Sequence, residues 1–313
     1  MVALSASTQY RATARWATAA VLLAASPLAS VFAQDLEPRL YTNVPLGINF
    51  LGAGYGYSEG NVLFDPTVAL ENAAIEIDGP VLGYGRSIRL GPFSGKVDGA
   101  IARVCLDGSA DYQGEHVTRN VCGSTDARAR VTVNFLGAPP LARQQFASYR
   151  QDWVFGASLQ MGLPVGDYDP ARLVNIGANR HSAKLEAGVS KNLTHWLLEI
   201  SLAETIYEDN TDFFGGGVRE QESITSLQGH AVYRFSSGIW LALDATRYHG
   251  GQTTTNGVRS SDLQSNTRLG LTASLPINAK QSVKVAASTG VSTRTGTDFD
   301  TVAAVWQYAW GGR

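Results

Sequence analysis

The sequence has no apolar run long enough for a transmembrane helix once its N-terminal segment is set aside, and this excludes a helical membrane protein. Charged residues make up only 17% of the 313 residues, whereas 44% are hydrophobic and 33 are glycine. That composition is too apolar and too rich in turn residues for a disordered chain. The 25 Lys and Arg are outnumbered by 27 Asp and Glu, so no nucleic-acid partner is expected.

The N-terminal segment has the features of a secretory signal. Arg11 and Arg15 precede a short apolar core at 16–25, and Val31 and Ala33 occupy the −3 and −1 positions of a cleavage site before Gln34. A short buried helix would carry polar residues on one face, and this stretch has none. We therefore predict a signal peptide over residues 1–33 and one membrane domain over residues 34–313.

Cysteine occurs at two positions, Cys105 and Cys122. The residues between them are mostly polar and are predicted to form a single loop. In an exported protein the default is a disulfide that closes such a loop. His116 and Glu115 lack the ligand spacing of a zinc site. We predict a Cys105–Cys122 disulfide, and neither a metal nor another cofactor.

Polar and apolar residues alternate along most of the remaining chain, which places one set of side chains on each face of a strand. About twelve such segments can be counted. They cover residues 44–57, 74–90, 93–105, 127–135, 153–163, 183–190, 196–202, 227–235, 241–246, 268–275, 283–288 and 299–310. A soluble sandwich also has alternating strands, so further evidence is needed to separate it from a transmembrane barrel.

The lengths of the connections favour the barrel. Short turns at 91–92, 191–194, 236–238 and 276–280 alternate with longer loops at 58–73, 106–126, 164–181, 207–223, 249–265 and 293–298. Bacterial outer-membrane barrels have short periplasmic turns and long extracellular loops. The pattern predicts an antiparallel up-and-down barrel in the bacterial outer membrane, with both termini periplasmic. Its outer face would contact lipid, while the sequence leaves the oligomeric state open.

Aromatic residues gather near both predicted ends of the strands, as membrane-interface belts require. One belt comprises Trp153, Trp196, Trp240, Tyr233, Phe235, Tyr308 and Trp310, and the other Tyr55, Tyr57, Tyr207, Tyr248 and Phe299. The chain also finishes on an amphipathic strand, V-W-Q-Y-A-W, before a final Gly-Gly-Arg. Trp240 is an exception, because its parity places it inside the barrel with Asp244.

One connection, residues 136–151, is too long for its place among the short turns. Leu141, Gln145, Phe146 and Tyr149 follow Pro140 at helical spacing, which predicts a short amphipathic periplasmic helix. An ordinary surface helix is favoured over one that lies against the mouth of the barrel.

Several blocks of sequence resemble the outer-membrane family labelled "putative MetA-pathway of phenol degradation". They are D-A-R-A-R-V-T-V-N, F-A-S-Y-R-Q-D, Y-D-P-A-R-L-V-N-I-G-A-N-R, D-F-F-G-G-G-V-R-E-Q, W-L-A-L-D-A-T, Q-S-N-T-R-L-G and S-T-G-V-S-T-R-T-G-T-D-F-D. The resemblance extends over nearly the whole predicted membrane domain. It implies a transporter-like outer-membrane barrel, and neither a substrate nor catalytic residues.

A channel for small solutes is therefore the first functional hypothesis. A barrel of about twelve strands is wider than the eight-stranded kind that side chains alone fill. The predicted inward-facing candidates for the solute pathway are Arg128, Arg130, Lys184, Glu186, Glu199, His230, Arg234, Asp244, Arg268 and Lys284. Cations outnumber acids in this set, which predicts a mild preference for anions such as aromatic carboxylates. The same charges are equally compatible with ion pairs that brace a closed barrel.

Two other functions remain open. An outer-membrane lipase or protease would need a histidine near the outer rim with suitable partners. His181 and His249 lie there, with Asp209, Asp212 and Ser260 nearby, but no G-x-S-x-G motif occurs. A structural or adhesion barrel would act through its loops. Aromatic and flexible residues in one long loop form a candidate gate or contact surface: Phe213, Phe214, Gly215, Gly216 and Gly217.

Overall fold

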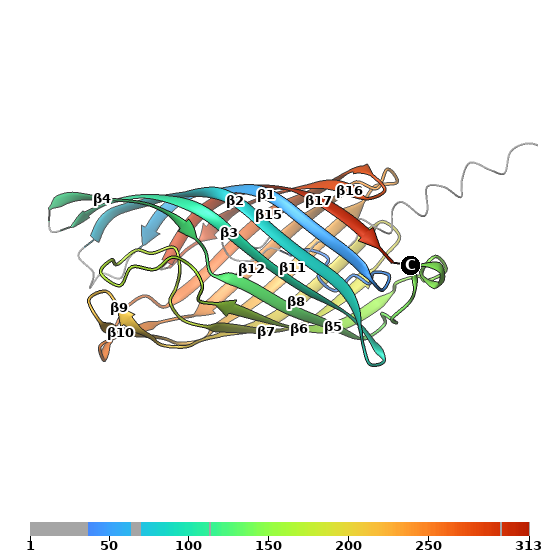
Figure 1. The fold of residues 1–313 in the computed structure, drawn as a ribbon, viewed down its shortest axis with the longest axis horizontal. Coiled ribbons are helices and arrows are strands. Elements are labelled where there is room, and N and C mark those ends of the chain that lie inside the picture. Colours follow the sequence, from blue (N-terminus) through green and yellow to red (C-terminus); the bar gives the residue numbers. More distant parts are fainter. Residues whose placement is uncertain (1–36, 64–69, 113, 295, 313) are drawn as a thin grey trace, which may run out of the picture.

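The computed structural model describes residues 37–63, 70–112, 114–294 and 296–312. The predicted signal peptide lies outside this part of the chain. Twelve of the thirteen strands in the main sheet form a closed antiparallel barrel (Figure 1). They are β1 (Ile48–Leu63), β2 (Leu70–Leu90), β3 (Phe93–Tyr112), β5 (Ala127–Leu136), β6 (Trp153–Leu163), β7 (Ser182–Asn192), β8 (Trp196–Tyr207), β11 (Ile224–Arg234), β12 (Trp240–Gly250), β15 (Gln264–Asn278), β16 (Gln281–Ser292) and β17 (Gly296–Gly311).

The barrel is an up-and-down meander. Each barrel strand pairs with the next one along the chain, and β17 returns to pair with β1 from Ile48↔Gly311 to Leu63↔Gly296. Closure leaves no free sheet edge around the barrel, as lipid requires. The predicted fold, a transmembrane barrel of about twelve strands, is confirmed.

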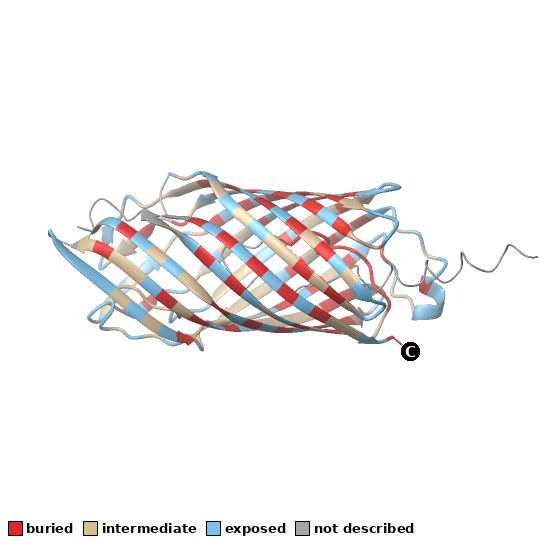
Figure 2. Ribbon diagram, turned by 90° about the horizontal axis from the view of Figure 1, so that it is seen from above, coloured by how far each residue is buried: buried red, intermediate tan, exposed pale blue. Residues whose placement is uncertain are grey.

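The barrel buries polar side chains and exposes apolar ones, the reverse of a soluble protein. On β12, Asp244 and Thr246 point inward and are 0% and 1% exposed, whereas Leu243, the residue before Asp244, is 61% exposed. Buried and exposed residues also alternate along the barrel strands on the near side in Figure 2. A bilayer accounts for it, because apolar residues on the outer face meet lipid while polar residues pair inside.

The strands extend beyond their predicted ends. β2 and β3 have 21 and 20 residues, about twice the length that a tilted strand needs to cross a bilayer. The predicted first strand over 44–57 instead begins at Ile48 and continues to Leu63. Sequence alternation marks only the lipid-facing part of each strand, because no lipid selects apolar residues beyond it.

The prediction of a single loop at 106–126 is wrong, because most of this segment forms a β-hairpin. β3 continues to Tyr112, and β4 (Glu115–Ser124) pairs with it outside the barrel. Cys105 and Cys122 lie directly opposite each other in this pairing and form the predicted disulfide. The hairpin protrudes at the end of the barrel that carries the long loops, hereafter the long-loop end (Figure 1).

Two other long loops also contain strands. β9 (Asn210–Phe213) and β10 (Gly217–Gln221) come from the loop after β8, and β13 (Thr253–Thr255) and β14 (Val258–Arg259) from the loop after β12. Together they form a separate four-stranded sheet in the order β14-β13-β10-β9. This sheet also lies at the long-loop end (Figure 1).

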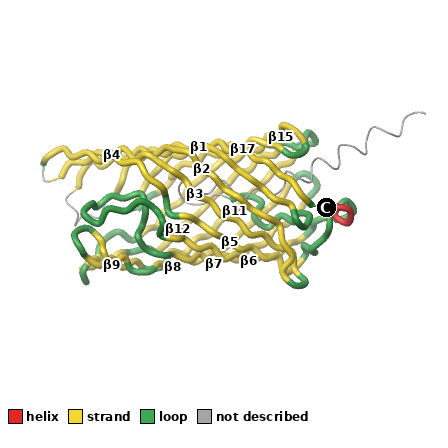
Figure 3. Tube along the Cα trace, viewed as in Figure 1, coloured by secondary structure: helices red, strands yellow, loops and turns green. Residues whose placement is uncertain are grey.

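The opposite end, hereafter the short-turn end, carries the C-terminus and helix α1 (Arg143–Phe146) (Figure 3). The predicted helix in the connection 136–151 is therefore present, with four residues. No helix in the described residues is long and apolar enough to span a membrane. On the outer surface here, Trp196 packs edge-on against Tyr233 at 5.0 Å, as expected of an interfacial aromatic belt. Trp240 faces inward, as its parity predicts, and is 4% exposed.

Candidate functional site

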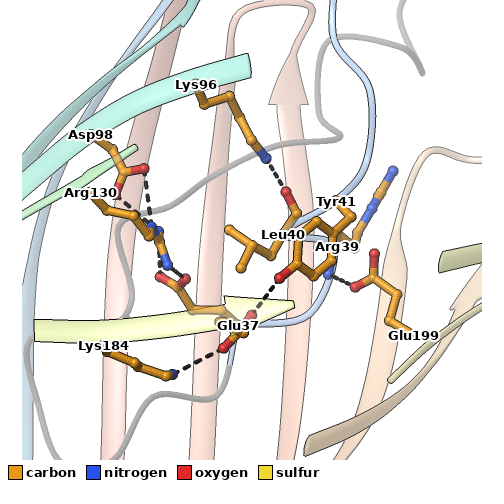
Figure 4. A network of polar contacts seen from close by, with 10 residues as sticks. Glu37, Arg39, Leu40, Tyr41, Lys96, Asp98, Arg130, Lys184 and Glu199 are labelled. Carbon is orange, nitrogen blue, oxygen red and sulfur yellow. Dashed lines mark hydrogen bonds and ion pairs between the residues drawn. The ribbon is translucent and has the colours of Figure 1, made fainter. Parts of the chain in front are cut away.

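The barrel lumen contains a segment of the chain that precedes β1. Residues 37–47, hereafter the plug, lie inside the barrel toward its short-turn end, where Leu46 bonds to the connection 136–151. Figure 4 shows Glu37, Arg39, Leu40 and Tyr41 of the plug among side chains of the wall. The backbone N–H of Arg39 donates to the Glu199 carboxylate, and the Lys96 ammonium donates to the carbonyl of Leu40. The Arg39 guanidinium lies over the ring of Trp240 at 5.4 Å, a cation–π contact that explains why this tryptophan faces inward.

Tyr41 is the central anchor of the plug. Its side chain is 2% exposed, and its hydroxyl donates a 2.9 Å hydrogen bond to Glu186. The ring lies against Gly156 and Gly188, which are paired partners on β6 and β7. A Cβ at Gly156 or Gly188 would come within 2.4 or 2.2 Å of the Tyr41 ring. These two glycines therefore leave the space that the tyrosine ring fills.

A chain of buried charges holds the start of the plug. The Arg130 guanidinium on β5 pairs with Glu37 of the plug and, at 2.9 Å, with Asp98 on β3. The three side chains are only 6–7% exposed. Removing one partner from such a buried set leaves an uncompensated charge, which is strongly destabilising. The arrangement therefore ties the plug to the barrel wall.

The plug also contacts the long connection 136–151. The Asn43 side chain donates to the carbonyl of Pro139 at 3.0 Å, and the N–H of Leu46 donates to the carbonyl of Leu141 at 2.9 Å. Leu40 and Ala138 belong to one buried apolar cluster. This connection is long because it lies against the plug at the mouth of the barrel, and it is not an ordinary surface segment.

A polar cavity of about 220 Å³ lies in the lumen on the long-loop side of the plug. Its lining comprises Arg128, Gln160, Gly162, Ser182, Lys184, Thr205, Tyr207, Ile224, Ser226 and Tyr248. Lys184 also forms a 3.1 Å ion pair with Glu186, the residue that accepts from Tyr41. The two basic residues of the cavity belong to the set predicted from the sequence, and the cavity has no acidic residue in its lining.

The other predicted residues are inside the barrel, but most of them bond to other residues of the barrel wall. His230 lies 2.7 Å from Asp244, which also accepts from Thr272 at 2.8 Å. Arg268 donates to the carbonyl of Phe299 at 2.7 Å, and Lys284 is 2% exposed on β16. Arg234 is further out, where it donates to the carbonyl of Leu193 in a short turn.

The residues of the plug site that the sequence did not predict include Glu37, Arg39, Tyr41, Lys96 and Asp98. The only signal for the last two was their spacing within 93–105, where Ser94, Lys96 and Asp98 share one face. The plug residues carry no periodic signal. The missed set adds two cations and two acids, so the surplus of cations inside the barrel is unchanged.

The candidate gating residues lie on the β9–β10 hairpin at the long-loop end. Phe213 has the Arg219 guanidinium over its ring at 4.9 Å, and Phe214 is 54% exposed. Gly215 and Gly216 adopt positive φ values of 82° and 87°, which glycine tolerates without strain. Gly217 begins the returning strand β10. These contacts fix where the hairpin lies in this structure. Its role as a gate stays a prediction.

The contacts of the rim histidines are with residues other than serine in the described part of the chain. His181 Nδ1 lies 2.7 Å from Glu208 in an exposed pair. His249 is exposed on β12, on the face opposite inward-pointing Tyr248. Within the described residues neither histidine is hydrogen-bonded to a serine hydroxyl, as a Ser–His nucleophile would require.

A closed barrel with an apolar outer face and a polar, plugged lumen defines the class of the protein as an outer-membrane β-barrel. Residues 74–306 match the family described as "Putative MetA-pathway of phenol degradation". The chain therefore belongs to this family. A comparison with curated protein sequences finds no match.

Solved structures show the same fold. The COG4313 outer membrane channel from Pseudomonas putida F1 has a TM-score of 0.72 at 17% identity, over 88% of this chain and 100% of that one. The transport unit of the autotransporter AIDA-I from Escherichia coli has a TM-score of 0.51 at 15% identity, over 96% and 100%. At these identities the likeness concerns the fold alone.

Proposed function

We propose that this protein is a channel for small organic anions, closed at rest by its own N-terminal plug. The observation that carries the proposal is the cavity of about 220 Å³ lined by Arg128 and Lys184, which has no acid in its lining. A basic cavity with low-dielectric walls raises the local concentration of anions. Solutes of this class include carboxylates of aromatic acids.

We assign the orientation of the channel from the two ends of the barrel. Outer-membrane barrels keep short turns in the periplasm and long loops outside, so we place the plug, α1 and the C-terminus on the periplasmic side. A solute entering from outside would then reach the basic cavity before it meets the plug. An epitope inserted at Gly114, in the β3–β4 hairpin, should be labelled by antibody on intact cells. The same epitope inserted in the 236–238 turn should be labelled only after the outer membrane is permeabilised.

The plug is a constriction that can be displaced without unfolding the barrel. The plug contacts the wall through its side chains and through single backbone groups such as the Arg39 N–H. None of its residues belongs to a barrel strand. Movement of residues 37–47 therefore costs the plug contacts and leaves the strand pairing intact.

Reversal potentials in planar bilayers under a salt gradient test the proposal. The purified protein should pass anions in preference to cations, and sodium benzoate should carry current. A cation-selective channel would contradict the assigned solute class. A protein that folds to the heat-modifiable barrel but never conducts, with or without residues 34–44, would contradict the channel itself.

A further inference from the structure

A second cavity, distinct from the lumen, lies at the long-loop end of the barrel. It has a volume of about 220 Å³ and lies between the β2–β3–β4 sheet, the connection 164–181 and the β9–β10 hairpin. Its lining comprises Ala73, Ile75, Leu106, Gly108, Ser109, Ala110, Val117, Thr118, Arg119, Ala171, Arg172, Leu173, Val174 and Phe214. Most of this lining is apolar.

The apolar lining departs from the rule for the rest of the barrel, where the inner face is polar. Leu106, Gly108 and Ala110 share the inward face of β3, and on β4 Val117 pairs with Ala110 and Arg119 with Gly108. The apolar strip continues down the wall as the cluster of Val81, Ala102, Val104 and Val305. Ile176 of the connection packs against that cluster, so the connection covers the lower part of the strip and leaves the cavity unfilled.

Hydrogen bonds fix the segments that surround the cavity. Asp167 at the start of the connection exchanges two hydrogen bonds with Ser124, of 2.9 and 2.6 Å. The Gly215 N–H donates to the carbonyl of Pro170 at 2.8 Å, and this bond holds Phe214 beside residues 171–174. Small-molecule sites are usually pre-formed concave apolar pockets with few polar groups, and this cavity matches that description.

Arg119 supplies the polar group. It lies on the inner face of β4, and its Nε is buried without a hydrogen-bond partner among the described residues. A buried donor without an acceptor costs free energy, which a bound acceptor recovers. Arg172 lines the same cavity, with its own weak pair to Asp169 at 3.8 Å. Two guanidinium groups favour a carboxylate ligand.

We infer that this cavity binds a one-ring organic carboxylate, with the ring among the apolar residues and Phe214 and the carboxylate toward Arg119. The size admits a single substituted ring, and an aromatic ring gains an additional contact with Phe214. The inference rests on the proposed function in one respect: it takes the ligand of this cavity to be the same solute that passes through the lumen. The site would then capture solute at the long-loop end before transfer to the basic cavity.

Equilibrium dialysis of benzoate against the purified protein in detergent tests the site. Benzoate should bind saturably, whereas acetate, which lacks the ring, and benzyl alcohol, which lacks the charge, should bind at least about tenfold more weakly. Gly108→Leu should abolish binding, because a Cβ at Gly108 has ordinary contacts of 3.6–3.7 Å and a larger side chain extends into the cavity. Phe214→Ala, in an exposed loop, gives a second variant with weaker binding.

Arg119→Gln should weaken benzoate binding about tenfold, as the loss of one charge-assisted hydrogen bond predicts. Arg103→Gln is the matched control, because Arg103 is exposed on the outer face of the same hairpin. Absence of saturable binding, or binding that survives both Gly108→Leu and Phe214→Ala, would overturn the site. Reversal potentials of the same variants separate the two proposals. Variants that have lost the site should still form anion-selective channels. A channel that is cation-selective but still binds benzoate would contradict only the proposed function.

Discussion

The Tyr41 hydroxyl donates to Glu186, a residue 145 positions later in the chain, and this bond is one of those that join the plug to the wall of the barrel. Glu186 also pairs with Lys184 at 3.1 Å, and Lys184 lines the basic cavity. The plug and the cavity therefore share one carboxylate. Displacing Tyr41 changes the environment of Lys184, so closure of the lumen and its charge are physically coupled.

The two glycines that contact the Tyr41 ring, Gly156 and Gly188, give the first prediction. Gly188→Ala places a Cβ 2.2 Å from the Tyr41 ring, so the ring and the plug must shift. We expect a larger single-channel conductance and more frequent opening than in the unmodified protein. Gly229→Ala on β11 is the matched control, because a Cβ there meets nothing within 4 Å. Equal conductance in the two variants would contradict the claim that the space left by these glycines holds the plug in place.

Removing the ring itself should have a larger effect. Truncation of a buried aromatic residue to alanine costs about 3 kcal/mol or more, and for Tyr41→Ala that loss falls on the docked plug and not on the strands. The ratio of open to closed channels should rise roughly a hundredfold, measured as open probability in bilayers. The heat-modifiable mobility of the barrel in gels should be unchanged. Loss of the folded band would show that Tyr41 supports the barrel as well.

The buried charges at Arg130 give the third prediction. Glu37→Gln removes one partner of the Arg130 guanidinium and leaves only Asp98, at 2.9 Å. Truncating one partner of a buried charge pair costs about 2–5 kcal/mol, so the plug should loosen and conductance should rise. Glu76→Gln, an exposed acid on the outer face of β2, should leave the conductance unchanged.

The barrel could be predicted from the sequence because lipid imposes a periodic rule on it. Apolar residues must alternate with inward-facing ones, so Lys184 and Glu186 could be assigned to the inner face from parity alone. The protruding part of β3 and the β4 strand paired with it lie beyond the barrel wall, and their residues carry no such signal. For the same reason residues 106–126 were predicted as a loop.

The plug could not be predicted, because nothing local to it reports its partners. Its contacts join residues 93 positions apart for Glu37 and Arg130 and 160 positions apart for Arg39 and Glu199. No alternation marks residues 37–47, and Val44 to Gly47 were instead assigned to the first strand. Trp240 on the inner face was the one visible sign, since an inward tryptophan requires something in the lumen to cover it.

The disulfide gives the fourth prediction. Cys105 and Cys122 are 17 positions apart and link β3 to β4 beyond the barrel wall. Replacing both by serine should lower the stability of the hairpin by about 3 kcal/mol, the value for a closed loop of this length. The hairpin should become sensitive to protease added to intact cells, while the barrel keeps its mobility in gels. A barrel that no longer assembles would contradict the separation of hairpin and wall.

The charge of the basic cavity gives the last prediction. Arg128→Gln removes one of the two cations that line it, while Arg247→Gln removes the same charge from the exposed outer face of β12, where Arg247 donates to Thr267 at 2.9 Å. A unit charge several ångströms from a permeating ion in a water-filled lumen contributes about 0.5–1 kcal/mol, so the anion-to-cation permeability ratio should fall roughly two- to fivefold in Arg128→Gln. The ratio should be unchanged in Arg247→Gln, and raising the salt concentration should reduce the difference because exposed charges are screened. Equal shifts in the two variants would mean that selectivity arises from the surface charge of the whole protein and not from the cavity.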